Sequence, residues 1–136
     1  MIFEFFILFI IFETKHLLAD YFLQFEYMYM NKGKEKGWLE PLLDHAGIHA
    51  IMTFIIIAIY LMYKGIPDII GHEFAMILTM GFVSFDFITH AIIDRWKATR
   101  KTDPSKTWFW LSLGIDQYLH HIVHIFILYG LAIISY

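Results

Sequence analysis

Four long apolar stretches, separated by short polar ones, dominate the pattern of hydrophobic and polar positions along the chain. They predict helices near residues 3–24, 45–63, 74–94 and 111–134, each close to the roughly 20 residues that a helix needs to cross about 30 Å of hydrocarbon. The first stretch begins apolar, with no basic residue before Glu4, so we expect a retained helix rather than a cleaved signal peptide. The pattern predicts an all-α polytopic integral membrane protein, with a single domain, 1–136, built as a bundle of four transmembrane helices.

Each predicted helix is interrupted by histidine and aspartate residues four positions apart. These groups are His16/Asp20, His45/His49, Asp86/His90/Asp94 and Asp116/His120/His124. A helix turns about 100° per residue, so positions four apart stay on one face. In a bilayer, a buried His or Asp is costly unless it is paired, bound to a metal or hydrated. Four matching polar stripes therefore predict one shared functional cavity.

Composition places the chain in a membrane and narrows its chemistry. Of its 136 residues, 59% are hydrophobic and 19% aromatic, which is too apolar for a soluble domain of this size. Ten basic against thirteen acidic residues give a net charge of −3, so we expect no nucleic-acid partner. The chain has no cysteine, which excludes thiolate metal sites and leaves histidine and carboxylate as ligands.

Basic residues are distributed unequally between the predicted helices. Only Lys64 lies in the second connection, whereas eight lie in the first and third: Lys32, Lys34, Lys36, Arg95, Lys97, Arg100, Lys101 and Lys106. By the positive-inside rule, we expect loops 25–44 and 95–110 to be cytoplasmic and both termini to lie outside, in a bacterial cytoplasmic (inner) membrane. In this topology all four stripes fall in the cytoplasmic half of the membrane, so the polar cavity opens towards the cytoplasm.

The stripes offer more metal ligands than one ion needs, which is normally three or four. Mixed histidine and carboxylate ligands suit zinc, manganese or iron, and we expect one or two divalent transition metals, zinc first. Di-iron bundles use Glu-x-x-His motifs, so the spacing of four favours hydrolytic chemistry, in which two ions activate a shared water. The ten candidate ligands are His16, Asp20, His45, His49, Asp86, His90, Asp94, Asp116, His120 and His124.

The order of these motifs resembles a known family. It runs from His16-Leu-Leu-Ala-Asp20-Tyr-Phe-Leu-Gln24 through a lysine-rich loop to His45 with His49, then His90-Ala-Ile-Ile-Asp94-Arg-Trp-Lys97 and Asp116-Gln117-Tyr-Leu-His120. Over nearly the whole chain this is similar to the family called domain of unknown function 3307, small bacterial and phage-encoded membrane proteins distantly similar to inner-membrane-associated metal-dependent hydrolases. The resemblance implies metal or catalytic roles for His16, Asp20, His45, His90, Asp94, Asp116 and His120, with Gln24, Lys97 and Gln117 nearby. It implies no substrate.

Taken together, these patterns favour a membrane-embedded metal-dependent hydrolase that acts on a phosphorylated or lipid-linked anionic substrate at the cytoplasmic face. Lys97 and Arg95 would bind the anionic group, and the glutamines would orient it by hydrogen bonds. The lipid bilayer is the other expected partner, and an oligomer is compatible with the sequence. We assign catalytic roles to Asp20, Asp94 and His120, and substrate binding to Gln24, Arg95, Lys97 and Gln117.

Two other functions are compatible with the same pattern. The column of Asp and His could relay protons or carry a divalent metal, although outer stretches such as 51–59 are almost purely apolar. Alternatively, the metal could only fix the helices of a non-catalytic membrane interaction protein. Among single residues, Glu13 is either an outer partner of His16 or a further ligand. For His121, a hydrogen bond to a neighbouring helix is the favoured role. For His124, such a hydrogen bond and a metal-ligand role are equally favoured.

Overall fold

The computed structural model of the chain describes residues 2–100 and 103–135. Within these ranges the regular structure is entirely helical, which confirms the all-α expectation. Two short helices were not predicted, because one or two turns are too short to show a helical period. The helices are α1 (Ile2–Tyr21), α2 (Glu26–Asn31), α3 (Leu39–Tyr63), α4 (Ile66–Ile70), α5 (His72–Ala98) and α6 (Thr107–Ser135).

The long helices differ from the expected ones at their ends. α3 begins at Leu39, before the predicted residue 45, because Pro41 lies in its first turn, where a missing N–H costs nothing. α1 ends at Tyr21, so Gln24 lies in the non-helical link to α2. α3 ends near Gly65, whose φ of 66° is in the left-handed region that favours glycine.

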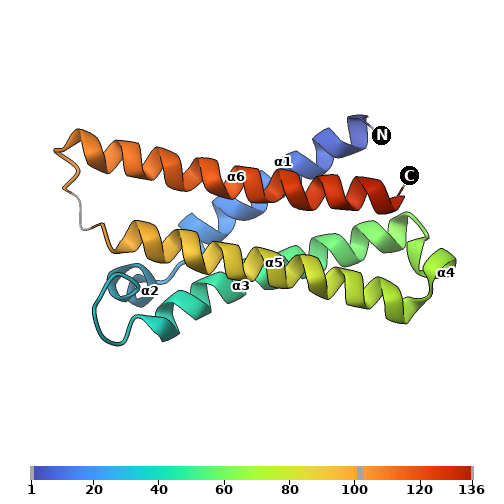
Figure 1. Cartoon of the computed structure of the whole chain (residues 1–136), viewed down its shortest axis with the longest axis horizontal. Coiled ribbons are helices and arrows are strands. Elements are labelled where there is room, and N and C mark those ends of the chain that lie inside the picture. The colour runs from blue at the N-terminus through green and yellow to red at the C-terminus, as the bar shows by residue number, and fades with distance from the viewer. Residues whose placement is uncertain (1, 101–102, 136) are drawn as a thin grey trace.

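The four long helices form one bundle (Figure 1). α3, α5 and α6 run beside one another in alternating directions, and α1 crosses obliquely and contacts both α3 and α6. The start of α1 and the end of α6 lie at the same end of the bundle as α4, whereas α2 lies at the opposite end. We call these the α4 end and the α2 end. The lysine-rich segments that follow α2 and close α5 therefore share the α2 end.

The interior of the bundle is apolar towards the α4 end and polar towards the α2 end. Phe12, Ile57 and Ile127 are fully buried in the apolar half, together with Leu61 and Leu131. The outside is apolar along most of its length. Its exposed side chains include Ile51, Ile55, Ile59, Ile88, Ile92, Phe126, Tyr129 and Ile133. An apolar exterior around a partly polar interior is the arrangement expected for a protein surrounded by lipid.

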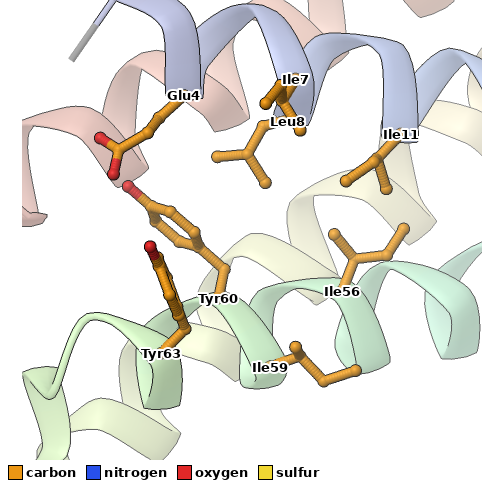
Figure 2. Close-up of a pocket in the computed structure, with 8 residues that line it drawn as sticks. All are labelled: Glu4, Ile7, Leu8, Ile11, Ile56, Ile59, Tyr60 and Tyr63. Carbon is orange, nitrogen blue, oxygen red and sulfur yellow. The ribbon is translucent and has the colours of Figure 1, made fainter.

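A groove between α1 and α3 marks the α4 end (Figure 2). Its volume is about 380 Å³, and isoleucines of both helices make up half of its eight lining residues. Figure 2 shows the Glu4 carboxylate at one end of the groove, pointing towards the hydroxyls of Tyr60 and Tyr63. Glu4 also pairs with Lys64, with 3.5 Å between Oε1 and Nζ. Because its lining is mostly apolar and it lies away from the histidines, this groove is not the candidate site.

Three helices of the described ranges are long and apolar enough to cross a membrane: α3, α5 and α6. The expectation of four such helices is therefore corrected to three within residues 2–100 and 103–135. α1 differs because every 18-residue stretch of it contains at least three charged residues, from Glu4, Glu13, Lys15 and Asp20. The chain is a membrane protein by these three helices, and α1 packs against them.

Candidate metal centre

Eight of the ten predicted ligands converge in the polar half of the bundle. Their side chains come from all four long helices, and most are buried because each stripe faces the bundle axis. We call this set the shared cluster: His16 and Asp20 from α1, His45 and His49 from α3, His90 and Asp94 from α5, and Asp116 and His120 from α6. The four-residue spacing places the polar side chains of each helix on one face. These side chains form a common site because the polar faces of all four helices meet.

The Asp20 carboxylate contacts histidines of α1 and α3. Its Oδ1 lies 3.1 Å from His49 Nε2 and 3.3 Å from His45 Nε2, and its Oδ2 lies 3.3 Å from His16 Nε2. The His49 ring in turn packs on the His90 ring, with 3.7 Å between centroids. Asp20, His45, His49 and His90 can present ligand atoms that all lie within 4.8 Å of one another. This is the size and composition of a transition-metal ligand set.

Asp94 lies between His45 of α3 and His120 of α6. Its Oδ2 is 3.3 Å from His45 Nε2, and its Oδ1 is 3.4 Å from His120 Nε2. His120 Nε2 also lies 3.7 Å from Asp116 Oδ1, which completes a second ligand set of Asp94, Asp116 and His120. A carboxylate whose two oxygens face different ligand groups has the arrangement that can bridge two ions.

Many ring nitrogens of the shared cluster have no hydrogen-bond partner in the described part of the chain. Both nitrogens of His16, His45 and His90 are in this state, because the nearby carboxylates are close but not aligned with them. A buried polar group without a partner costs about 1–3 kcal/mol. Converging buried nitrogens with free lone pairs fit a bound divalent metal, which would satisfy several of them at once.

Asp86, a predicted ligand, lies apart from the shared cluster. Its Oδ2 accepts a bond from Lys15 Nζ at 3.0 Å and one from Thr53 Oγ1 at 2.6 Å, and both partners are buried. Lys15 and Thr53 were not identified from the sequence. The signal for Lys15 was present, because a lysine inside an apolar stretch requires a buried partner.

His124 also lies outside the shared cluster. Its Nδ1 is 3.0 Å from Glu13 Oε1, and the His121 Nδ1 contacts the other oxygen of the same carboxylate at 2.5 Å. The His124 ring remains close to His16, with 5.4 Å between centroids. Glu13 is therefore a partner of two α6 histidines rather than of His16.

A cationic cavity borders the shared cluster at the α2 end. Its volume is about 620 Å³, and Lys32, Lys34 and Lys97 are among its lining residues. Lys32 reaches from it into the cluster, since its Nζ donates to Asp94 Oδ2 at 2.6 Å. Lys97 Nζ lies 3.5 Å from Ser112 Oγ and stacks over the Phe109 ring. Sequence reasoning placed Lys32 among topology-determining residues and missed its contact with the site.

The segment that carries Lys32 is held in place by three contacts. Arg95 donates through Nη1 to the carbonyl oxygens of Lys32 and Lys34, at 2.7 and 3.0 Å, and stacks on Trp38. Gly33 packs so closely on the Ala98 carbonyl that a Cβ would lie 2.5 Å from its oxygen. The Tyr27 hydroxyl donates to Asp44, a bond that raises the pKa of the Tyr27 phenol. Arg95 thus positions the cavity wall.

Of the two glutamines assigned to substrate binding, Gln117 contacts the shared cluster. Gln117 Nε2 donates to Asp116 Oδ2 at 3.2 Å, which orients that carboxylate. Gln24 is half-buried in the link after α1, and its Nε2 has no hydrogen-bond partner among the described residues. Of the four residues predicted to bind substrate, only Lys97 lines the cationic cavity.

No curated protein and no solved structure is significantly similar to the chain. The expected likeness to metal-dependent hydrolases therefore stays a prediction. The family match extends over nearly all of the helical bundle and includes every residue of the shared cluster. Residues 5–135 match the family described as protein of unknown function (DUF3307), and the chain belongs to that family.

Proposed function

We propose that this DUF3307 protein is a membrane-embedded, metal-dependent hydrolase acting on a phosphorylated or lipid-linked anionic substrate at its α2 end. The position of Asp94 carries the proposal. Its carboxylate faces histidines of two other helices, and Lys32 joins the same carboxylate to the cationic cavity. The candidate metal ligands and the cationic cavity, which can hold an anion, therefore meet at the Asp94 carboxylate. Metal-assisted hydrolysis of a phosphoester requires both.

The ions would be held by residues that already converge. We propose one or two divalent transition metals, with zinc preferred to manganese or iron, because imidazole and carboxylate donors are mixed. When bound, such ions supply an activated water and stabilise negative charge on the transferred group. Two candidate ligand sets that share no residue are Asp20/His45/His49/His90 and Asp94/Asp116/His120, and a third, His16/His90/His120, overlaps both.

The protein side chains would bind the substrate and move its protons. Lys32 and Lys97 attract the anionic group into the cavity, where Lys32 can exchange Asp94 for the substrate. Asp20 has the most exposed carboxylate of the cluster, 21% against 8% for Asp94, so we assign to it the acceptance of a proton from water. With a single ion in the first set, His120, whose Nε2 lies between Asp94 and Asp116, is assigned proton donation to the leaving group.

Transport is less well supported than hydrolysis. A path for ions or protons needs polar groups along the whole bundle. Among the described residues, buried charged side chains extend from the shared cluster as far as Lys15 and Asp86. The half beyond is filled mainly by Phe12, Ile57 and neighbouring apolar side chains, and its buried Thr79 hydroxyl bonds to its own helix. A site open at one end fits an enzyme better than a channel.

Lys97→Ala should weaken substrate binding without removing the metal. Lys97 lines the cavity but is not in either ligand set. If its contact is equally strong in the ground and transition states, KM for phosphomonoesters should rise about tenfold or more with kcat unchanged, which corresponds to at least about 1.4 kcal/mol. Steady-state kinetics of purified protein on soluble phosphomonoesters and phosphorylated lipids measures this. Lys36→Ala, an exposed charge outside the cavity, is the control. Equal KM values for the two variants would contradict the assignment.

We propose that the α2 end faces the cytoplasm of a bacterial cell, with the bundle in the inner membrane. The distribution of lysine and arginine supports this orientation. Because the chain has no cysteine, Lys34→Cys and Asp68→Cys each introduce one reactive thiol at opposite ends. An impermeant maleimide added to intact spheroplasts should label the variant at position 68 and reach position 34 only after permeabilisation. The reverse pattern would place the cavity outside the cytoplasm.

A further inference from the structure

Glu13, His121 and His124 form a separate cluster between α1 and α6, which we call the α1–α6 triad. The Glu13 carboxylate contacts Nδ1 of His121 with one oxygen and Nδ1 of His124 with the other, at 2.5 and 3.0 Å. The histidines are three residues apart on α6 and therefore lie on one face of that helix. The triad belongs to neither of the ligand sets proposed for hydrolysis.

The triad has the donors of a metal site. A carboxylate oxygen and two ring nitrogens can all lie within 4.8 Å of one another. Two histidines and one glutamate are a known ligand set for zinc, which leaves a further coordination position open. The triad is accessible from outside the bundle, since the side chains of His121 and Glu13 are 40% and 23% exposed. His124, in contrast, is buried.

Charge balance favours an ion over a simple hydrogen-bonded group. Two neutral imidazoles can each donate one N–H to Glu13, but they leave the carboxylate charge unbalanced within the triad, and the Lys15 ammonium on α1 is already paired with Asp86. Uncompensated charge at such a position is costly. His121 Nδ1, although it lies close to Glu13, also makes no aligned hydrogen bond in the described ranges. A divalent cation would neutralise the carboxylate and use both Nδ1 lone pairs.

We propose that the α1–α6 triad binds one divalent transition metal ion and fastens α1 to α6. α1 carries four charged residues in 20 positions and supplies His16 and Asp20 to the shared cluster. An ion at the triad would fix the helix that carries both residues. This site does not depend on the proposed hydrolysis, because its ligands and its consequence for helix packing are its own.

Cobalt titration tests the triad directly. Full-length protein in detergent, stripped with a chelator, is titrated with Co²⁺ and followed by its visible absorption. His121→Ala and Glu13→Gln should each bind one equivalent fewer than the unaltered protein and should lose Co²⁺-dependent thermal stabilisation. His72→Ala, which removes an exposed histidine at the α4 end, should bind as many equivalents as the unaltered protein. Equal binding by His121→Ala and His72→Ala would overturn the proposal.

A second measurement separates this site from the shared cluster. In His45→Ala/His90→Ala/His120→Ala protein, which lacks ligands of both sets of the shared cluster, one Co²⁺ equivalent should remain and should disappear when His121→Ala is added. Failure of the cluster variant to bind any Co²⁺ while folded would refute the triad. Loss of the triad ion with full hydrolysis, or its retention without hydrolysis, would distinguish the two proposals.

Discussion

Asp94→Asn should remove metal and destabilise the bundle together. The substitution keeps the volume of the side chain but removes the anion that faces His45, His120 and Lys32. Losing one partner of a buried charged cluster costs about 3–5 kcal/mol. Even outer partners of metal ligands change affinity about 10–100-fold, so loss of a ligand should lower metal affinity by at least the upper value. Elemental analysis after dialysis and thermal unfolding in detergent measure both effects.

Asp68→Asn is the matched control for Asp94→Asn. Asp68 is 84% exposed at the α4 end, far from the shared cluster, and its replacement should change neither metal content nor unfolding temperature. Hydrolysis of phosphoesters should vanish in Asp94→Asn and persist in the control. A variant at position 94 that keeps full metal content and activity would show that Asp94 is not a ligand.

Lys15→Met should destabilise the protein by about 3–5 kcal/mol, because it leaves the buried Asp86 carboxylate without its cationic partner. The double variant Lys15→Met/Asp86→Leu should recover most of this loss, since a buried ion pair replaced by apolar side chains is often neutral. A double-mutant cycle by denaturant unfolding measures the coupling. Additive effects of the two single variants would contradict the ion pair.

The same variants decide the role of Asp86. Sequence spacing assigned this residue to the metal, whereas the structure pairs it with Lys15 and Thr53. Metal content should therefore remain unchanged in Lys15→Met/Asp86→Leu protein while its stability is measured. Loss of an ion from this variant would restore Asp86 to the ligand set.

The helical periodicity of the sequence was sufficient to predict the long helices and which His and Asp residues share a helix face. Residues four apart share a helix face whatever the helix packs against, so the pattern alone grouped His45 with His49 and His90 with Asp94. The exclusion of α1 from the candidate spans was also present in the sequence, as a count of its charges. The short helices and exact helix ends were less accessible, because caps and turns depend on a few residues rather than on a period.

Only the tertiary structure decided which stripe positions meet. The contacts Lys15–Asp86, Lys32–Asp94 and Glu13–His124 join residues 71, 62 and 111 positions apart. Each depends on how far a helix is rotated about its axis and where it crosses its neighbours. Helical period places side chains on a face but leaves that rotation free, and packing of the apolar half of the bundle sets it. The sequence by itself therefore determined the polar faces and their chemistry, and packing divided them into a shared cluster, an ion pair and a triad.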